Sequence, residues 1–294
     1  MADTMHALAK AGELWGDSAP KAYAAALEKG TPFLLCTHPV SMQRADLGKI
    51  KLGDYVVGDK TDGVRQFLLI ATHENQKYVC VIDRNCTVTM LPSVRVSNME
   101  LYKGTLIDGE FIASSATLVA LDIVAFNGLQ AWRAPHGKRM GALHSILPAI
   151  LTDGWRIVPK AWYPLSAVTS IPGAEGLIFV PVQEGMKPGK CDSLFKWKAV
   201  HTVDFLVKAD GLYVSDRGQP LCVSHMFSLA FAAHASDSVV ECTLHPMPQH
   251  PWLLHVVKVR QDKSTPNDIK TLHATMRNVL EAVHRPELNA CLAK

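Results

Sequence analysis

The 294-residue sequence contains no apolar run that approaches the roughly 20 residues a helix needs to cross a bilayer, and it does not begin with an apolar segment of the signal-peptide kind. Its seven cysteines are odd in number and include no CxxC pair. A disulfide framework would require paired cysteines. These absences predict a protein of a reducing, intracellular compartment, with free thiols and no membrane partner.

The sequence also has little excess charge of either sign. Its 30 lysines and arginines against 27 aspartates and glutamates give a net charge of +3, which is too small to imply nucleic-acid binding by itself. The distribution of the basic residues is more informative, because they gather within strand-like apolar sequence at 187–198 and 258–263. Some of these cations are therefore expected to face an anionic ligand.

Internal repeats and low-complexity tracts are absent as well, and a chain with 48% hydrophobic and 19% charged residues is typical of a globular protein with a substantial core. From residue 33 to about 205, short strand-like runs joined by turn-length gaps predict an α+β domain with antiparallel sheets. Residues 203–260 have the pattern of four or five short strands, which predicts a small β-barrel of the OB type. Helical periodicity follows Pro266. We therefore expect a first domain over 1–203, a barrel over 204–266, and a C-terminal helix over 267–294 that packs back on the first domain.

The stretch GDYVVGDKTDGVR places a lysine, Lys60, at the end of an apolar run. One interpretation is structural: two strands, 55–59 and 64–71, are joined by a KTDG turn, since Asp-Gly is common in β-hairpins. The other interpretation is that Lys60 is a reactive amine. An amine attacks only when it is unprotonated, so a nucleophilic lysine needs burial and neighbouring positive charge to lower its pKa. The choice depends on the partners that the rest of the chain supplies.

Charged residues recur within or at the ends of strand-like apolar runs along the chain. A charge buried in such a strand costs several kcal/mol unless it is paired or bound to a ligand. One such residue could belong to a structural ion pair, but an ordered series predicts a site for an anionic ligand, with carboxylates for a metal ion. The series consists of Arg84, Glu110, Asp122, Glu175, Lys196 and Lys198.

The motifs KTDGVR, IDR, IDGEF, LVALD, EGLIF, LFKWK followed by TVDF, and RQDKSTPN resemble, in this order, the motifs of the covalent nucleotidyltransferase superfamily. They are most similar to those of the mRNA capping guanylyltransferases, including small viral forms. TVDF and RxDKxxPN favour capping enzymes over the DNA ligases, which share KxDG. The resemblance runs from Pro39 to Asn267. It implies an α+β fold: a nucleotidyltransferase domain of ATP-grasp-like antiparallel sheets, followed by a C-terminal OB-fold β-barrel domain.

The resemblance also implies a two-step reaction. Lys60 would attack the α-phosphate of GTP, expel pyrophosphate and form a lysyl-Nζ–GMP phosphoamidate, and a 5′-diphosphate RNA end would then take the GMP to give GpppN. Mg²⁺ or Mn²⁺ would be held by Asp62 and Glu175, and these carboxylates could also support the lysine itself. The expected GTP-binding residues are Thr61, Arg65, Arg84, Glu110, Lys160, Lys196, Lys198, Asp204, Arg260, Asp262 and Lys263.

Within that set, the resemblance assigns different parts of GTP to different residues. Arg84 and Glu110 would hold the ribose hydroxyls. Lys196 and Lys198 would contact the α-phosphate. The residues that would contact the β- and γ-phosphates, which leave as pyrophosphate, are Arg260, Asp262 and Lys263.

Two positions concern the guanine base. Lys160, in VPKAWYPL, matches a lysine that the family uses at guanine O6, which is a hydrogen-bond acceptor where adenine has a donor amine. Leu121 is a departure, because viral capping enzymes often have an aromatic residue just before the LVALD aspartate. Stacking on guanine is therefore expected to be weaker here, or to come from another ring.

Two other functions stay open. An ATP-dependent polynucleotide ligase would share the lysyl-nucleotide chemistry. A non-catalytic OB-fold module would bind RNA for another subunit, although such a module has no need of KTDG, IDGE, EGLIF and KWK together. The sequence shows no cysteine-phosphatase, acidic-tunnel or methyltransferase signature, so separate RNA triphosphatase and cap methyltransferase proteins are the expected partners beside GTP and RNA. The expected location is the nucleus or a cytoplasmic site of viral transcription.

Overall fold

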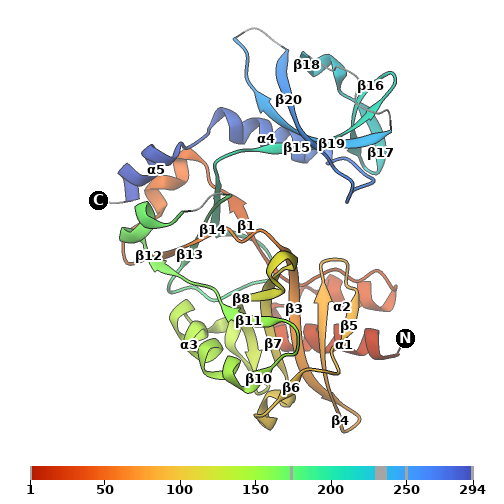
Figure 1. The fold of residues 1–294 in the computed structure, drawn as a ribbon, viewed down its shortest axis with the longest axis vertical. Helices are drawn as coiled ribbons and strands as arrows, with labels where there is room; N and C mark the ends of the chain where they lie inside the picture. Colours follow the sequence, from red (N-terminus) through yellow and green to blue (C-terminus); the bar gives the residue numbers. More distant parts are fainter. Residues whose placement is uncertain (1, 173–174, 229–236, 249–250, 293–294) are drawn as a thin grey trace. The chain divides into compact units, whose positions relative to one another are not determined.

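The computed structural model describes residues 2–172, 175–228, 237–248 and 251–292 (Figure 1). The chain divides into two compact units. The first unit comprises Met1–Val40, Ile50–Lys196 and Leu292–Lys294, and the second comprises Ser41–Lys49 and Trp197–Cys291. Within the described residues, no helix is long and apolar enough to cross a membrane.

A seven-stranded sheet forms the centre of the first unit. Its strand order is β11-β8-β7-β3-β4-β5, with β9 paired to β8, and neighbouring strands are antiparallel except for β11 and β8. The strands are β3 (Val64–His73), β4 (Gln76–Asp83), β5 (Val88–Met90), β7 (Thr105–Ile112), β8 (Thr117–Phe126), β9 (Leu129–Gln130) and β11 (Arg156–Pro159).

Helices cover both faces of this sheet, because the side chains of β3 alternate between two apolar clusters. Leu69 packs in one cluster with Trp15 of α1, whereas Ile70 packs in the other with Leu143 of α3. Successive residues of a strand point to opposite faces, so a strand buried on both sides has an unbroken apolar sequence. The helices of this unit are α1 (Ala2–Trp15), α2 (Lys21–Glu28) and α3 (His136–Ile146).

A second sheet in the first unit has the order β1-β14-β13-β2-β12. Its strands are β1 (Thr37–Ser41), β2 (Tyr55–Asp59), β12 (Tyr163–Pro164), β13 (Gly176–Pro181) and β14 (Gly189–Lys198), and the ends of β1 and β14 continue into the second unit. β2 pairs with β12 and β13, whereas β3 pairs with β4 and β7. The hairpin interpretation of KTDG is therefore wrong: residues 60–63 connect two different sheets.

The remaining short elements join these layers. β6 (Arg95–Val96) and β10 (Ile150–Leu151) form a two-stranded antiparallel sheet. Short 3-10 helices lie at Gly16–Ser18, Arg44–Lys49, Met99–Lys103, Ala113–Ser115, Ala131–Arg133, Leu147–Ala149, Leu165–Ser170 and Ser224–Met226.

The second unit contains a six-stranded sheet with the order β17-β16-β15-β19-β20-β18. Neighbours are antiparallel except for β18 and β20, and the sheet curls in the manner of the expected OB-type barrel (Figure 1). The strands are β15 (Thr202–Lys208), β16 (Gly211–Asp216), β17 (Gln219–Cys222), β18 (Phe227–Ser228), β19 (Ser238–His245) and β20 (Trp252–Val259). The predicted fold class is thus confirmed.

The C-terminal helical segment differs from its expected place. α4 (Ile269–Leu280) packs on β15, β16 and β19 of the second unit rather than on the first domain. Leu272 is fully buried in the barrel core with Phe205, because the apolar face of the helix covers the curled sheet. The Asp268 side chain caps the helix by accepting a hydrogen bond from the Lys270 amide at 2.9 Å. α5 (Arg285–Leu292) follows.

Replacing Leu272 by alanine should lower the free energy of unfolding by about 2–5 kcal/mol, because it leaves a cavity between α4 and the sheet. Leu280→Ala, on the same helix, is the matched control: Leu280 is 65% exposed, so its loss should change stability by about 0.5 kcal/mol or less. Urea unfolding followed by circular dichroism measures both. Equal losses in the two variants would contradict the packing of α4 on the barrel.

Candidate active site

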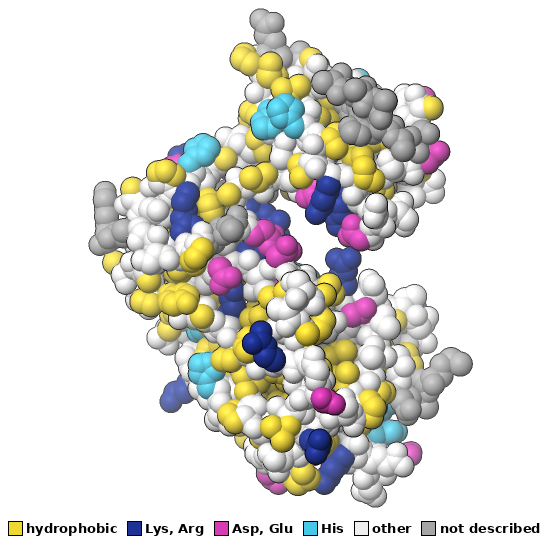
Figure 2. Space-filling model, viewed as in Figure 1, with side chains coloured by type: hydrophobic (Ala, Val, Ile, Leu, Met, Phe, Trp, Pro, Cys, Tyr) yellow, Lys and Arg dark blue, Asp and Glu magenta, His cyan; other side chains and the backbone are white. Residues whose placement is uncertain are grey.

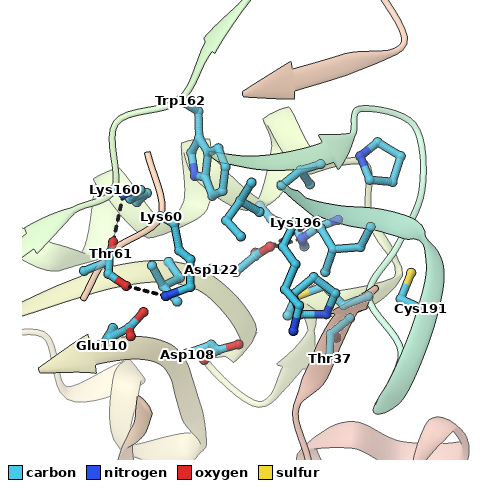
Figure 3. A pocket seen from close by; sticks show the side chains of 18 of the residues that line it. Thr37, Lys60, Thr61, Asp108, Glu110, Asp122, Lys160, Trp162, Cys191 and Lys196 are labelled. Atoms are coloured by element: carbon cyan, nitrogen blue, oxygen red, sulfur yellow. Dashed lines mark hydrogen bonds and ion pairs between the residues drawn. The ribbon is translucent and has the colours of Figure 1, made fainter. Parts of the chain in front are cut away.

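A cavity of about 260 Å³ opens in the first unit and is lined by side chains from both of its sheets (Figure 3). Both apolar and charged residues line it. Such a mixture suits a ligand with both an apolar ring and charged groups. The charged lining residues are Asp59, Lys60, Arg65, Asp108, Glu110, Asp122, Arg139, Lys160, Glu184 and Lys196.

Lys60 is held at this cavity by its backbone and its side chain. Its amide donates a hydrogen bond to the Gly176 carbonyl at 2.8 Å, which continues the pairing of β2 with β13. Its Nζ donates to Glu175 Oε1 at 2.5 Å. The side chain is 21% exposed, so it stays accessible to a ligand. The sequence led us to expect positive charge next to this amine, but its direct partner is the Glu175 carboxylate.

Arg65 and Glu110 lie opposite each other on the paired strands β3 and β7. Arg65 Nε donates to Asp108 Oδ1 at 2.6 Å, and its Nη2 donates to the other oxygen of that carboxylate. Burial raises the pKa of Asp108, and the Arg65 guanidinium opposes this rise. Burial also raises the pKa of Glu110, opposed by Lys60 and Arg65, and Glu110 Oε1 accepts a hydrogen bond from the Gly63 amide at 3.2 Å.

A second buried ion pair lines the cavity and was not predicted. Arg139 of α3 donates to Asp122 of β8 through Nε at 2.8 Å and Nη2 at 2.9 Å. Its Nη1 donates to the carbonyls of Ala134 and Glu184. The signal for this pair is the position of Arg139 in the sequence, because it lies on the same helical face as His136 and Leu143, which are both buried.

Lys160 is only 6% exposed, and its ammonium is fixed at the cavity wall. Nζ donates to Asp59 Oδ1 at 2.7 Å and to Thr61 Oγ1 at 2.8 Å. A lysine ammonium has three N–H groups. Two go to these partners, so one is left for an acceptor on a ligand.

The predicted site residues fall into three groups. Those that line the cavity are Lys60, Thr61, Arg65, Glu110, Lys160 and Lys196. Three others belong to the first unit without lining it: Glu175 contacts Lys60, Asp62 is exposed, and Arg84 is exposed in the turn between β4 and β5. Those in the second unit are Lys198, Asp204, Arg260, Asp262 and Lys263.

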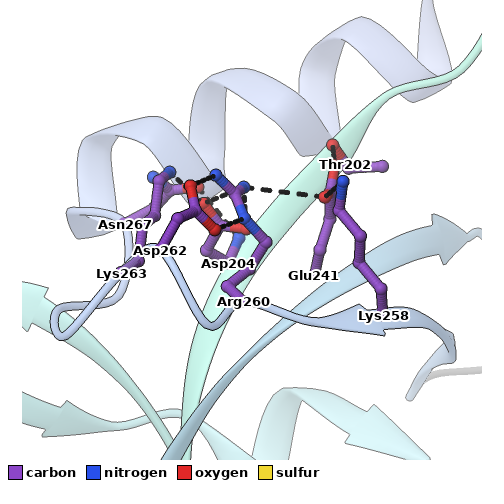
Figure 4. Close-up of polar contacts among 8 residues, drawn as sticks. All are labelled: Thr202, Asp204, Glu241, Lys258, Arg260, Asp262, Lys263 and Asn267. Carbon is purple, nitrogen blue, oxygen red and sulfur yellow. Dashed lines mark hydrogen bonds and ion pairs between the residues drawn. The ribbon is translucent and has the colours of Figure 1, made fainter. Parts of the chain in front are cut away.

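In the second unit, four of these residues form one charge network (Figure 4). Arg260 donates to Asp204 at 3.0 Å and to both oxygens of Asp262, at 2.8 and 2.7 Å. Lys263 also pairs with Asp204, whose side chain is 5% exposed. The amide of Asp204 donates to Asn267 Oδ1 at 2.9 Å. Hydrogen bonding to Arg260 lowers the pKa of Asp262. The predicted cations are thus together, and their direct partners are carboxylates.

The two basic runs of the sequence contain cations that pair with acids. Lys190 lies 2.7 Å from Asp192, and Lys258 lies 3.5 Å from Glu241. On the face drawn in Figure 2, basic and acidic side chains of the described residues are interspersed within each unit. The pair of Lys190 and Asp192 is exposed, and exposed pairs contribute little stability.

His136, at the start of α3, packs at the rear of the cavity wall. It is 4% exposed, and its ring meets that of the lining residue Trp162 edge to face, with centroids 5.4 Å apart. Burial lowers the pKa of His136 to about 4; Arg139 acts in the same direction and Asp122 opposes it. The imidazole is therefore neutral at neutral pH.

Comparison with known proteins identifies related sequences over most of the chain. The family model of the mRNA capping enzyme, catalytic domain, matches residues 25–159, and that of the mRNA capping enzyme, C-terminal domain, matches residues 187–289. The mRNA-capping enzyme of Caenorhabditis elegans is 24% identical over 84% of this chain and 46% of its own length. For the mRNA-capping enzyme subunit alpha of Kluyveromyces lactis, the identity is 30%, over 63% of this chain and 49% of its own length.

The chain spans about half the length of these relatives. Among solved structures, the mycobacterial DNA ligase D complexed with ATP and MES aligns with a TM-score of 0.48 and 15% identity, over 78% of this chain and 96% of that chain.

The buried, neutral His136 predicts a loss of stability in mild acid. The unfolded residue takes a proton near its ordinary pKa of 6.5, whereas the folded residue does so only near 4. Between these values the unfolded state binds more protons, so stability falls as the pH is lowered through this window, by up to about 3 kcal/mol.

Denaturant unfolding at several pH values between 6.5 and 4 measures this loss. His136→Phe should make the loss of stability with falling pH smaller, because an aromatic ring remains and no group at this position takes up a proton. His144→Phe is the matched control, since His144 is exposed on the same helix and should leave the pH dependence unchanged. The assignment is wrong if both variants keep the dependence of the parent protein.

Proposed function

Because the chain belongs to the mRNA capping enzyme family, we propose that it is a GTP:RNA guanylyltransferase that carries GMP on Lys60 and transfers it to the 5′-diphosphate end of RNA. The observation that carries this proposal is the position of Lys60. Its amine lies at a cavity wall, beside a carboxylate that can accept its proton, with further cations lining the same cavity. A solvated surface lysine would have none of these features.

In the first step, Lys60 Nζ forms a bond to the α-phosphorus of GTP while the bond to the β-phosphate oxygen breaks and pyrophosphate leaves. Glu175, at 2.5 Å, accepts the proton that the ammonium must lose. In the second step, a terminal phosphate oxygen of the RNA attacks the same phosphorus, and Lys60 leaves with a proton returned to it. Positioning and charge neutralisation are the protein's main tasks in such transfers.

The ligand contacts are proposed from the lining residues. Lys196 would neutralise the α-phosphate, and Glu110 would hold the ribose. Lys160 would donate its third N–H to guanine O6, where adenine has a donor instead. Thr61 fixes the Lys160 ammonium and so acts on the base through it. Arg65, paired with Asp108, would act mainly by shaping the cavity floor.

We propose that a divalent cation, Mg²⁺ or Mn²⁺, binds at the site together with GTP. Within the described residues, no group of three His, Cys, Asp or Glu side chains could hold a metal by itself. Mg²⁺ is commonly bound by one or two carboxylates together with substrate phosphates. Glu175 suits this mode of binding and Asp62, which is exposed, would supply a second oxygen ligand. The cation would neutralise phosphate charge.

The exposed or second-unit residues also have proposed roles. Arg84 would contact the ribose, Lys198 the α-phosphate, and Arg260 with Lys263 the phosphates that leave. In the structure, Arg260 and Lys263 both pair with Asp204. Phosphate oxygens would therefore replace carboxylate oxygens as their partners, while Asp262 keeps Arg260 oriented.

The wider setting is proposed on the same basis. RNA triphosphatase and cap methyltransferase activities would be supplied by other proteins, since capping requires a diphosphate end before this step and a methyl group after it. The nucleus, or a cytoplasmic site of transcription, is where such substrates occur.

Lys60→Ala and Lys60→Arg should both abolish the covalent GMP adduct. Alanine removes the amine, and the arginine guanidinium stays protonated and cannot attack. Protein incubated with α-labelled GTP and a divalent cation, then denatured in detergent, shows the adduct on a gel. Lys138→Ala is the matched control, because Lys138 is exposed on α3 and should label normally. Label retained in either Lys60 variant would refute the assignment, and label from ATP rather than GTP would indicate a ligase.

Lys160→Met should weaken the use of GTP by about 1–3 kcal/mol, because it keeps the apolar stem and removes the donor to O6. The use of ITP, which also has O6, should weaken by the same amount. The triphosphate of 2-aminopurine riboside lacks O6 and should be used equally by both proteins. The measurement is the initial rate of adduct formation at low nucleotide concentration. Equal losses for all three nucleotides would give Lys160 a structural role instead.

A further inference from the structure

The cavity contains one aromatic ring. Among the described residues that line it, Trp162 is the only phenylalanine, tyrosine or tryptophan. Leu121 and Ile178, which also line it, are aliphatic. Figure 3 shows the indole reaching into the cavity from the segment that follows Lys160. A planar base that enters this cavity therefore has a single ring on which to stack.

The Trp162 ring is held in place from two sides. A Cβ atom added at Gly58 of β2 would lie 2.9 Å from the indole Cε3 and 3.0 Å from Cζ3, so the strand backbone lies directly against the ring. His136 meets the ring at an angle of 90°. A ring fixed before the ligand arrives loses little conformational entropy on binding. Gly58 is thus required for this position of the indole, since any larger residue would displace it.

Trp162 is also only two residues from Lys160, whose ammonium is anchored by Asp59 and Thr61. Residues 160–162 therefore bring a hydrogen-bond donor and an aromatic ring to the same cavity. The donor can meet the edge of a base, and the ring can meet its face. These two contacts have different consequences, because stacking accepts any base whereas an edge contact depends on the base's own donors and acceptors.

We propose that Trp162 is the stacking residue for the purine base of GTP and takes the place of an aromatic ring at Leu121. This inference rests on the proposed function. Trp162 supplies affinity for any purine nucleotide, and Lys160 supplies the choice of guanine. The two residues are therefore separable by substitution.

Binding of labelled GTP to protein carrying Lys60→Ala, measured by equilibrium dialysis, tests the proposal without the transfer reaction. Added Trp162→Leu should weaken the binding of GTP, ITP and 2-aminopurine riboside triphosphate alike, by about 5- to 150-fold, the usual effect of losing one stacked base. Trp162→Phe, which keeps an aromatic face, should bind within about 3-fold of the parent. Trp155→Leu is the matched control, because Trp155 is partly buried in the same unit but does not line the cavity.

A rescue variant distinguishes the loss of stacking from misfolding of the Trp162→Leu protein. Leu121→Phe added to Trp162→Leu should bind all three nucleotides at least about 3-fold more tightly than Trp162→Leu alone, because it returns a ring to the cavity. Unchanged GTP binding in Trp162→Leu, or a loss that matches Trp155→Leu, would overturn the proposal, and so would a loss confined to GTP and ITP. If the protein with Lys60 intact forms no adduct with GTP, the proposed function fails, whereas the binding result for Trp162 stands on its own.

Discussion

The contact between Lys60 Nζ and Glu175 depends on one pairing of strands. β2 and β13 run antiparallel with Asp59 opposite Leu177, and the Lys60 amide extends this ladder to Gly176. The register of this strand pair therefore places the Lys60 amine next to the Glu175 carboxylate. A shift by one residue would turn each side chain of β2 to the other face of the sheet. The position of the nucleophile in our account thus follows from backbone hydrogen bonds rather than from the KTDG residues alone.

The buried ion pairs around the cavity contribute more to the geometry of the site than to the stability of the fold. Arg65 with Asp108 and Arg139 with Asp122 are both bidentate, and both lie on β3, β7 and β8 or the helix that covers them. Desolvation offsets most of the attraction in such pairs, so apolar replacements are often as stable. What the pairs do provide is fixed geometry, because a planar guanidinium held at two oxygens has little freedom to rotate.

The sequence predicts the local features of this chain well and its long-range pairings poorly. The span 55–59 agrees with β2, and Lys60, Glu110, Lys160 and Lys196 come together as their ordered motifs imply. The hairpin reading of KTDG failed because strand partners are chosen by residues far away in the chain. Arg139 was missed for the same reason, since its partner Asp122 lies on another element. The prediction assigned α4 to the wrong unit because the pattern of apolar residues on a helix does not indicate which sheet the helix covers.

If Lys60 carries the nucleotide, GMP must be found on this residue after reaction with GTP, and mapping the modified residue shows whether it is. The unaltered protein would be incubated with GTP and Mg²⁺, digested, and analysed by mass spectrometry under conditions that preserve the phosphoamidate bond. We expect GMP attached to the peptide that contains Lys60, and to no other lysine peptide. A guanylate on a different residue, such as Lys160 or Lys196, or unmodified protein after prolonged incubation, would contradict it.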